Sequence, residues 1–383
     1  MEVSLKTMGK HLVLAGGGHA HLSVLLNLAG YVQRGHRVTL IGPSPYHYYS
    51  GMGPGLLSGI YRAQDARFHI KKTAEDAGGL FIEDKAIRID PVQRTLNLQS
   101  GNRVSYDVVS FNTGSDVPPG PLISAARENI VPVKPVFNLL LARRVILRAL
   151  KQKPMKFVVI GGGPSGVETA ASLWRLANES RGKSTIRLIA GRKLLGGLPE
   201  KARKLALRSL TGRGITVTEG NRVDEMTHDE IRLTDGLSHP FDIAFTALGV
   251  RPSRIFSDSG IPAGPDGGLL VNSFLQSVAH PEMFGGGDCV SFADRPLAKV
   301  GVYAVRQNPI LLHNLLAALE GRAMKAFTPQ RDYMLIFNMG NGRGILWKKN
   351  FIWEGRLAFL LKDYIDRKFM RRFQVAGESN EEE

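Results

Sequence analysis

The sequence predicts an α/β fold with two parallel-sheet units, because one residue pattern occurs twice along its 383 residues. Each occurrence begins with a short apolar strand that leads into a glycine-rich turn, at 12–18 and again at 157–163. Each continues to a later strand that starts with an aromatic residue and an aspartate and ends in glycine, at 106–114 and 241–249. A strand, a glycine turn and a helix in this order are typical of a Rossmann-like dinucleotide-binding unit. Two such units in one chain indicate two nucleotide sites, which suits a redox enzyme.

The order of the segments predicts that the second unit is inserted within the first. The proline-rich stretch 116–121 breaks any regular element and is typical of a linker, and strands return after the second glycine-rich unit. We therefore expect two Rossmann-like dinucleotide-binding domains and a C-terminal α+β segment. The expected boundaries are 10–120 with 241–327 for the first domain, 121–240 for the second, 328–375 for the C-terminal segment, and 376–383 for an acidic disordered tail.

Composition limits the partners and the compartment. A net charge of +16 favours an anionic partner, which can be a membrane surface, an acidic protein or a nucleic acid. Without an arginine-glycine repeat, a zinc-ligand cluster or a basic helix-turn-helix pattern, nucleic acid is not expected. Cys289 is the one cysteine, so the chain has no internal disulfide or thiol pair and suits a reducing, cytoplasmic compartment. We also see no secretory signal and no apolar run of the ~20 residues that a spanning helix needs.

The second glycine turn fits the dinucleotide fingerprint. Gly161 permits the tight turn, Gly163 lets the backbone approach a pyrophosphate, and Gly166 lets the helix pack on the strand. The following strand does not end in an acid that would accept ribose hydroxyls. Arg192 and Lys193 stand there instead, and they either hold a 2′-phosphate or are solvated loop cations. Both NADH and NADPH therefore remain open.

The first glycine turn departs from the fingerprint. Gly16 and Gly18 are present, but His21 replaces the third glycine. This histidine either widens the contact between helix and strand or places an imidazole near the phosphates. His19 and His21 have no third partner at ligand spacing, so we favour packing or phosphate contact and expect no metal site.

Further candidate cofactor contacts follow the first turn. The loop 46–55 combines tyrosines with glycines, including Tyr49, Ser50 and Gly51, and offers flat faces and close backbone approach to a ring system. Asp288 follows an apolar strand and can accept hydrogen bonds from a polyol chain.

A third group of candidates begins a predicted helix. Lys299 precedes the helix, and Val302 lies in its first turn. A helix N-terminus with a nearby lysine would stabilise negative charge on a reduced ring system.

The segment 355–374 predicts an amphipathic helix with many cations around its apolar face. Such a helix can lie in a lipid interface, or its apolar face can pack on the body of the protein or on a second subunit, which would make a homodimer. The apolar residues at helical spacing are Leu357, Leu360, Leu361, Tyr364, Ile365, Phe369 and Phe373.

Taken together, these motifs resemble the pyridine nucleotide-disulfide oxidoreductase family over nearly the whole chain, and within it the type II NADH dehydrogenases and sulfide:quinone oxidoreductases. The stretches 16–21 and 49–52 look still more like the flavoprotein domain fused to some selenide, water dikinases. The resemblance implies FAD in the first site and a nicotinamide cofactor in the second. It would make Gln307 a match for a quinone-side glutamine. The other residues that it assigns are Gly16, Gly18 and Asp288 to FAD, and Gly161, Gly163, Gly166 and Glu168 to the nicotinamide cofactor.

The single cysteine separates this chain from part of that family. Disulfide reductases need a redox cysteine pair and sulfide oxidation needs cysteines that carry sulfur, so both reactions are disfavoured. We therefore expect an NAD(P)H:quinone oxidoreductase, peripheral on the inner face of the cell membrane, with a quinone or another small acceptor. Two alternatives stay open: a soluble reductase of an acidic electron-carrier protein, and a flavin-bearing accessory or sensor protein linked to selenium metabolism.

Overall fold

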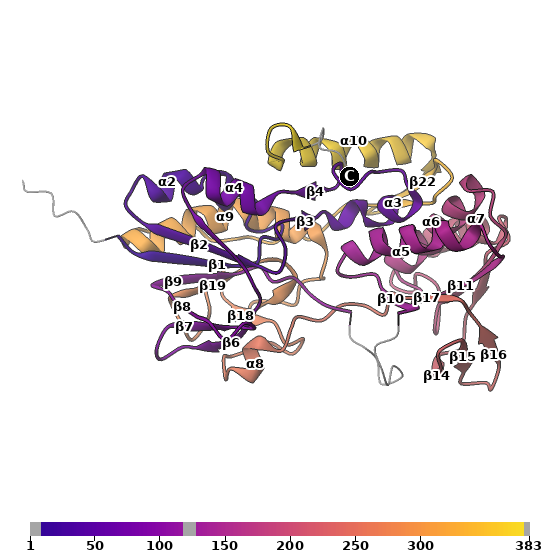
Figure 1. Ribbon diagram of the computed structural model, residues 1–383, viewed down its shortest axis with the longest axis horizontal. Coiled ribbons are helices and arrows are strands. Elements are labelled where there is room, and N and C mark those ends of the chain that lie inside the picture. The colour runs from indigo at the N-terminus through magenta and orange to yellow at the C-terminus, as the bar shows by residue number, and fades with distance from the viewer. Residues whose placement is uncertain (1–8, 118–127, 379–383) are drawn as a thin grey trace, which may run out of the picture.

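The computed structural model describes residues 9–117 and 128–378, which form two lobes with a long C-terminal helix lying across both (Figure 1). Of the expected linker, residues 118–121 lie outside the described part. Asp116, at its start, forms an antiparallel bridge with Arg251.

The first lobe contains a five-stranded sheet in the order β19-β9-β1-β2-β5, in which all neighbours are parallel. Its central strand β1 is buried along its whole length, as expected of a parallel strand covered on both faces. The strands are β1 (His11–Ala15), β2 (Arg37–Gly42), β5 (Leu80–Glu83), β9 (Val108–Phe111) and β19 (Met283–Gly285).

The second lobe repeats this arrangement. Its five-stranded parallel sheet has the order β10-β17-β11-β12-β13, so the strand that leads into the glycine turn again lies between the next strand along the chain and the later aromatic-Asp strand. The strands are β10 (Ile130–Pro132), β11 (Met155–Ile160), β12 (Ser184–Ile189), β13 (Thr216–Thr218) and β17 (Ile243–Thr246).

Helices cover both sheets, and α3, although it comes early in the chain, packs against α5 and α6 of the second lobe. The helices are α1 (Leu22–Leu26), α2 (Leu28–Val32), α3 (Gly53–Ser58), α4 (Ile70–Asp76), α5 (Phe137–Leu150), α6 (Pro164–Glu179), α7 (Glu200–Thr211), α8 (Ile255–Asp258), α9 (Gly301–Glu320) and α10 (Arg356–Phe373), with short 3-10 turns η1 (Ser50–Met52) and η2 (Gly287–Cys289).

Smaller sheets extend the lobes. Three are antiparallel and three-stranded, and two are two-stranded. Their strands are β6 (Ala86–Asp90), β7 (Thr95–Leu98) and β8 (Arg103–Ser105); β14 (Val223–Met226), β15 (Glu230–Leu233) and β16 (Ser238–Pro240); β21 (Leu335–Asn338), β22 (Gly344–Lys348) and β23 (Phe351–Gly355); β18 (Leu269–Val271) with β20 (Val290–Phe292); and β3 (His47–Tyr48) with β4 (Arg67–Phe68).

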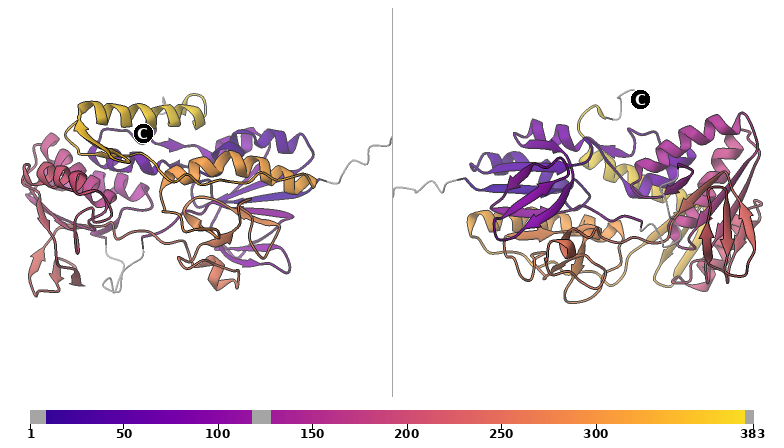
Figure 2. Two further views of the ribbon diagram at one scale, coloured as in Figure 1. Left: turned by 180° about the vertical axis from the view of Figure 1, so that it is seen from behind. Right: turned by 60° about the horizontal axis from the view of Figure 1, so that its bottom comes forward.

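The C-terminal segment joins the lobes. Phe337 and Ile345 of β21 and β22 belong to the apolar core of the second lobe, whereas Met370 and Phe373 of α10 belong to the core of the first. Figure 2 shows α10 from behind, again running above both lobes.

Two expected boundaries differ from the structure. β17 pairs with β11 and β10, so the second unit extends beyond residue 240, where we expected the first domain to resume. The expected disordered tail is also too long at its start, because Glu378 is buried, while residues 379–383 lie outside the described part. Among the described residues, no helix is both long and apolar enough to span a membrane.

Candidate functional site

One cavity of about 1920 Å³ lies between the two lobes, and the glycine turns 16–18 and 161–163 both line it. Ordinary ligand pockets measure about 300–1,000 Å³, so this cavity has the size for two extended ligands rather than one small one. Each turn stands at the carboxyl end of its sheet's central strand, where open α/β sheets bind their ligands. The geometry therefore brings two nucleotide-type sites onto one shared space.

The first glycine turn packs closely against Asn112, the residue that follows β9. Gly16 has φ +92°, and a Cβ on it would lie 2.4 Å from the Asn112 carbonyl oxygen. A Cβ on Gly18 would lie 2.4 Å from Asn112 Oδ1, which accepts a hydrogen bond from the Ala20 N–H at 3.0 Å. Close packing thus requires glycine at both positions, and at Gly16 the backbone conformation requires it as well.

His21 is buried within the first lobe and does not line the cavity. Its Nδ1 lies 2.6 Å from the Gly16 carbonyl oxygen and its Nε2 2.8 Å from Ser110 Oγ. Burial lowers the pKa of His21 to about 4, so the imidazole is neutral at physiological pH. The structure thus places His21 in the packing between α1 and the sheet, away from the cavity wall.

His19 does line the cavity, together with His47 of β3. The two imidazoles approach at 3.2 Å between His19 Nδ1 and His47 Nε2. Burial lowers the pKa of His19 to about 4 and that of His47 well below its ordinary value, so this wall of the cavity carries neutral rings.

The tyrosine-glycine loop is divided between the cavity and the body. Ser50 and Gly51 line the cavity. Tyr49 does not: its hydroxyl donates to Asp366 Oδ1 at 3.1 Å and its ring packs on Phe369 of α10. The tyrosine therefore fixes α10 rather than facing a ligand, because its loop turns this side chain away from the cavity.

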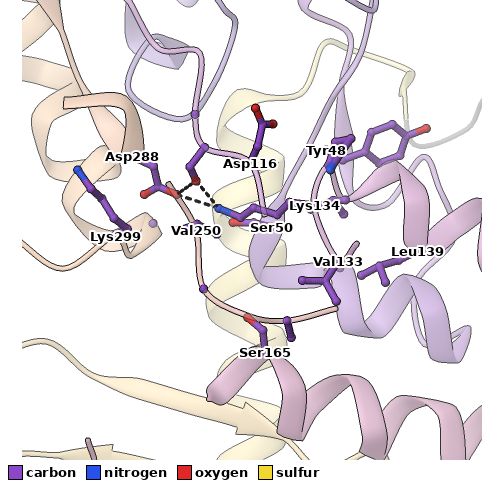
Figure 3. A pocket seen from close by; sticks show the side chains of 18 of the residues that line it. Tyr48, Ser50, Asp116, Val133, Lys134, Leu139, Ser165, Val250, Asp288 and Lys299 are labelled. Atoms are coloured by element: carbon purple, nitrogen blue, oxygen red, sulfur yellow. Dashed lines mark hydrogen bonds and ion pairs between the residues drawn. The ribbon is translucent and has the colours of Figure 1, made fainter. Parts of the chain in front are cut away.

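Asp288 lines the cavity and is paired with a lysine that the sequence motifs did not identify. Lys134 Nζ lies 2.8 Å from Asp288 Oδ2 and 3.1 Å from Ser115 Oγ, and Ser115 donates to the same carboxylate oxygen at 2.8 Å. Figure 3 shows Lys134 and Asp288 pointing toward each other in the cavity wall. Lys134 comes from the segment after β10, and no local motif marks it; the contact follows only from the assembled topology.

Of the candidates around the start of α9, only one lines the cavity. Lys299 lines the cavity, but its Nζ is 2.7 Å from Asp266 Oδ2, so its charge is balanced within the protein. Val302 and Gln307 do not line the cavity. Gln307 is buried, and its Oε1 accepts the Gly287 N–H at 2.7 Å. From the second turn of α9, its amide therefore reaches the backbone beside Asp288.

The second turn is open toward the cavity. Gly161 has φ +129°, and a Cβ on Gly166 would lie 1.8 Å from the Gly161 carbonyl oxygen, so both positions exclude any larger residue. A Cβ on Gly163 would meet no atom within 4 Å, which leaves the free space that a pyrophosphate would need. Gly166 itself does not line the cavity; it acts through packing.

Arg192, the candidate for a 2′-phosphate contact, is exposed and is not among the residues that line the cavity.

Glu168, on the first turns of α6, lines the cavity and accepts the Asn338 N–H at 2.8 Å. Burial raises the pKa of Glu168 to about 7, against the opposing effect of Lys362. Lys362 of α10 is partly buried, with its Nζ 2.7 Å from Asp366 Oδ2 and from the Gly51 carbonyl oxygen. Although burial lowers the pKa of Lys362, the Asp366 and Glu168 carboxylates hold it above its ordinary value. Glu168 is therefore a carboxyl group that can hold or release a proton near neutral pH.

The described residues contain no group of three or more His, Cys, Asp or Glu side chains that could hold a metal ion. The arrangement instead offers two glycine turns, a Lys134–Asp288 pair and a titratable Glu168 around one space. This donor set fits nucleotide cofactors and proton exchange.

Comparison with known proteins gives the same picture. The family model described as pyridine nucleotide-disulphide oxidoreductase matches residues 10–313. The chain is 24% identical over 321 residues to ferroptosis suppressor protein 1 of Taeniopygia guttata, covering 79% of this chain and 80% of that protein. It is 23% identical over 331 residues to the mitochondrial external alternative NAD(P)H-ubiquinone oxidoreductase B2 of Arabidopsis thaliana, covering 76% of this chain and 56% of that one.

Among solved structures, NDH2 of Plasmodium falciparum in complex with NADH superposes with a TM-score of 0.82 at 14% identity, covering 97% of this chain and 96% of that one. At this identity the likeness concerns the fold. It extends over both lobes and the C-terminal segment.

Proposed function

The chain belongs to the pyridine nucleotide-disulphide oxidoreductase family, and we propose that it is an FAD-dependent NAD(P)H dehydrogenase that passes electrons to a quinone. The observation that carries the proposal is that both glycine turns open on one cavity. The family uses FAD and a pyridine nucleotide, and the relative from Arabidopsis thaliana is named for NAD(P)H and ubiquinone.

The residues of the first lobe fit FAD. The turn at Gly16 and Gly18 would hold the pyrophosphate, and Asp288, oriented by Lys134 and Ser115, would accept hydrogen bonds from the ribityl hydroxyls. When bound, FAD supplies the electron-accepting chemistry. The protein then contributes binding, orientation and the charge of its surroundings.

The residues of the second lobe fit the pyridine nucleotide. The open space at Gly163 would admit its pyrophosphate at the N-terminus of α6, whose dipole favours negative charge. Glu168 stands in the same cavity and can hold a proton at its carboxyl oxygen near pH 7. Its place beside Lys362 connects this proton to the C-terminal helix.

The C-terminal helix α10 supports the proposal that the electron acceptor is a quinone dissolved in the membrane. α10 directs the Lys362–Asp366 pair toward the body and leaves leucines outside: Leu357 is 62% exposed and Leu360 is 55% exposed. Phe369 and Phe373 of the expected apolar face pack on the first lobe, so the exposed leucines are the part that is left for a lipid interface or, as the alternative, for a second subunit. Exposed cations that flank the stripe, each worth about 1 kcal/mol near an anionic leaflet, are Arg356, Lys368, Arg371 and Arg372.

An anaerobic titration of the purified protein tests the core of the proposal. We expect bound flavin whose visible absorbance is bleached stoichiometrically by NADH or NADPH, and is restored by adding a short-chain ubiquinone analogue. A flavin spectrum that neither nucleotide bleaches would contradict the dehydrogenase and favour the accessory or sensor alternative. Bleaching followed by reoxidation only by ferredoxin, with a steep salt dependence, would replace the quinone by an acidic carrier protein.

Vesicle sedimentation tests the membrane contact. We expect the protein to sediment with vesicles of phosphatidylethanolamine and phosphatidylglycerol, and the double variant Leu357→Asp, Leu360→Asp to stay in the supernatant. Val92→Asp is the matched control, since Val92 is 91% exposed and lies in the first lobe. Equal sedimentation of all three proteins would refute the membrane contact, and a shift of the double variant from dimer to monomer would assign the stripe to a subunit interface.

A further inference from the structure

The cavity end beside β12 differs in charge from the cavity end beside the first lobe. Glu83 and Asp84 line the cavity at the end of β5, whereas at the end of β12 the described lining residues include no carboxylate. Ala190 follows β12 directly and abuts the second glycine turn, since a Cβ on Gly162 would lie 2.6 Å from the Ala190 carbonyl oxygen. An acid at this place would accept the ribose 2′- and 3′-hydroxyls of NADH.

Two cations occupy this end of the cavity. Lys193 and Arg222 both line it. An antiparallel bridge joins Gly191 to Asn221, so Arg222 lies beside the end of β12 although it is about thirty positions further along the chain. The sequence of the segment after β12 therefore does not reveal that Arg222 lies at this end of the cavity.

The nearby acids are engaged elsewhere. Glu219 accepts the Leu194 N–H at 2.6 Å and pairs with Arg203 at 2.6 Å, and it does not line the cavity. Lys193 Nζ lies 2.9 Å from Glu200, but both side chains are about half exposed, so this pair is weak and easily exchanged. Within the described part of the chain, no carboxylate pairs with Arg222.

We propose that Arg222, assisted by Lys193, binds the 2′-phosphate of NADPH and makes NADPH the preferred electron donor. A guanidinium can form two parallel hydrogen bonds to a phosphate, and these charge-assisted bonds are stronger than neutral ones. This inference rests on the proposed function, because it assumes that the pyridine nucleotide occupies the second site.

Binding of nucleotide fragments to the FAD-loaded protein gives a readout that does not depend on turnover. By calorimetry, adenosine 2′,5′-bisphosphate should bind roughly 10- to 100-fold more tightly than adenosine 5′-monophosphate, and Arg222→Gln should remove most of the difference. Lys193→Gln should remove a smaller part. The preference should also weaken at high salt, because the cations are exposed.

Arg192→Gln is the matched control, since Arg192 is exposed on the same loop but does not line the cavity. The ratio of kcat/KM for NADPH to that for NADH should fall in Arg222→Gln and stay unchanged in Arg192→Gln, with unfolding temperatures unaltered. Equal binding of the two fragments, or an effect carried by Arg192 instead, would overturn the inference while leaving the dehydrogenase intact. If neither fragment binds and neither nucleotide bleaches the flavin, the proposed function itself fails.

Discussion

The two glycine turns are packed alike at their first glycine but differ at the later positions: a Cβ on Gly16 would lie 2.4 Å from the Asn112 carbonyl oxygen, and a Cβ on Gly161 would lie 2.2 Å from the Ala247 carbonyl oxygen. In the first, Asn112 packs against Gly16 and Gly18, and His21 replaces the third glycine with an imidazole bonded to the turn itself. In the second, Gly166 lets α6 approach the strand, and the space above Gly163 stays free.

The difference indicates that the two turns suit ligands with different residence times. A turn braced by buried side chains suits a ligand that remains bound, because the site is organised before the ligand arrives. A turn with open space above it suits a ligand that enters and leaves in each cycle. A resident FAD and an exchanging NAD(P)H would require this pair of properties.

The sharpest way to test the comparison is at the third position of the second turn. Gly166→Ala places a Cβ 1.8 Å from the Gly161 carbonyl oxygen, so we expect a loss of about 3 kcal/mol or more in unfolding free energy. Gly163→Ala is its control: with no atom within 4 Å of the new Cβ, stability should hold while affinity for NAD(P)H falls. Thermal unfolding and nucleotide titration of both variants measure these effects, and equal unfolding temperatures would show that α6 can move away from the strand at little cost.

The first turn should depend on its histidine almost as strongly. His21→Ala leaves the Gly16 carbonyl and Ser110 without their partner and opens a cavity, which should cost about 2–4 kcal/mol and reduce retention of FAD. His21→Gly restores the fingerprint glycine, yet we expect no rescue, because the space there fits an imidazole. His228→Ala, at an exposed site, is the control. Full stability of the glycine variant in urea unfolding would mean that the two turns are interchangeable.

The smallest expected effect concerns charge at the second turn. Since the pKa of Glu168 is raised to about 7, its carboxyl is mainly protonated at pH 6 and mainly ionised at pH 8. Affinity for the oxidised nucleotide, whose nicotinamide ring is positive, should therefore rise by roughly threefold to tenfold over this range. Glu168→Gln should bind with the same affinity at both pH values, as measured by calorimetry. A pH dependence that survives in this variant would assign the titration to another group.

The repeated strand and glycine pattern predicted the two sheets well. A strand buried on both faces requires a run of apolar residues, and a tight turn requires glycine, so both features can be recognised from a few neighbouring residues. The end of the second unit was placed too early, since the short buried run Ile243–Thr246 of β17 does not reveal which of two sheets it will join. Lys134 and Arg222 were missed for a related reason: each reaches the cavity through the pairing of distant segments. Gln307 and Tyr49 were assigned to ligands although their polar groups are used inside the protein.

The position of α10 determines how a nucleotide can leave. This helix contacts β21, β22 and β23 on one side and β4 and α1 on the other, so its two ends are fastened to different lobes. A rigid-body rotation that spread the lobes apart would have to break one set of these contacts. We therefore expect the nucleotide to enter and leave through an opening of fixed width rather than by a hinge motion of the lobes. Its exchange rate should then be set by diffusion and by side-chain motion at that opening.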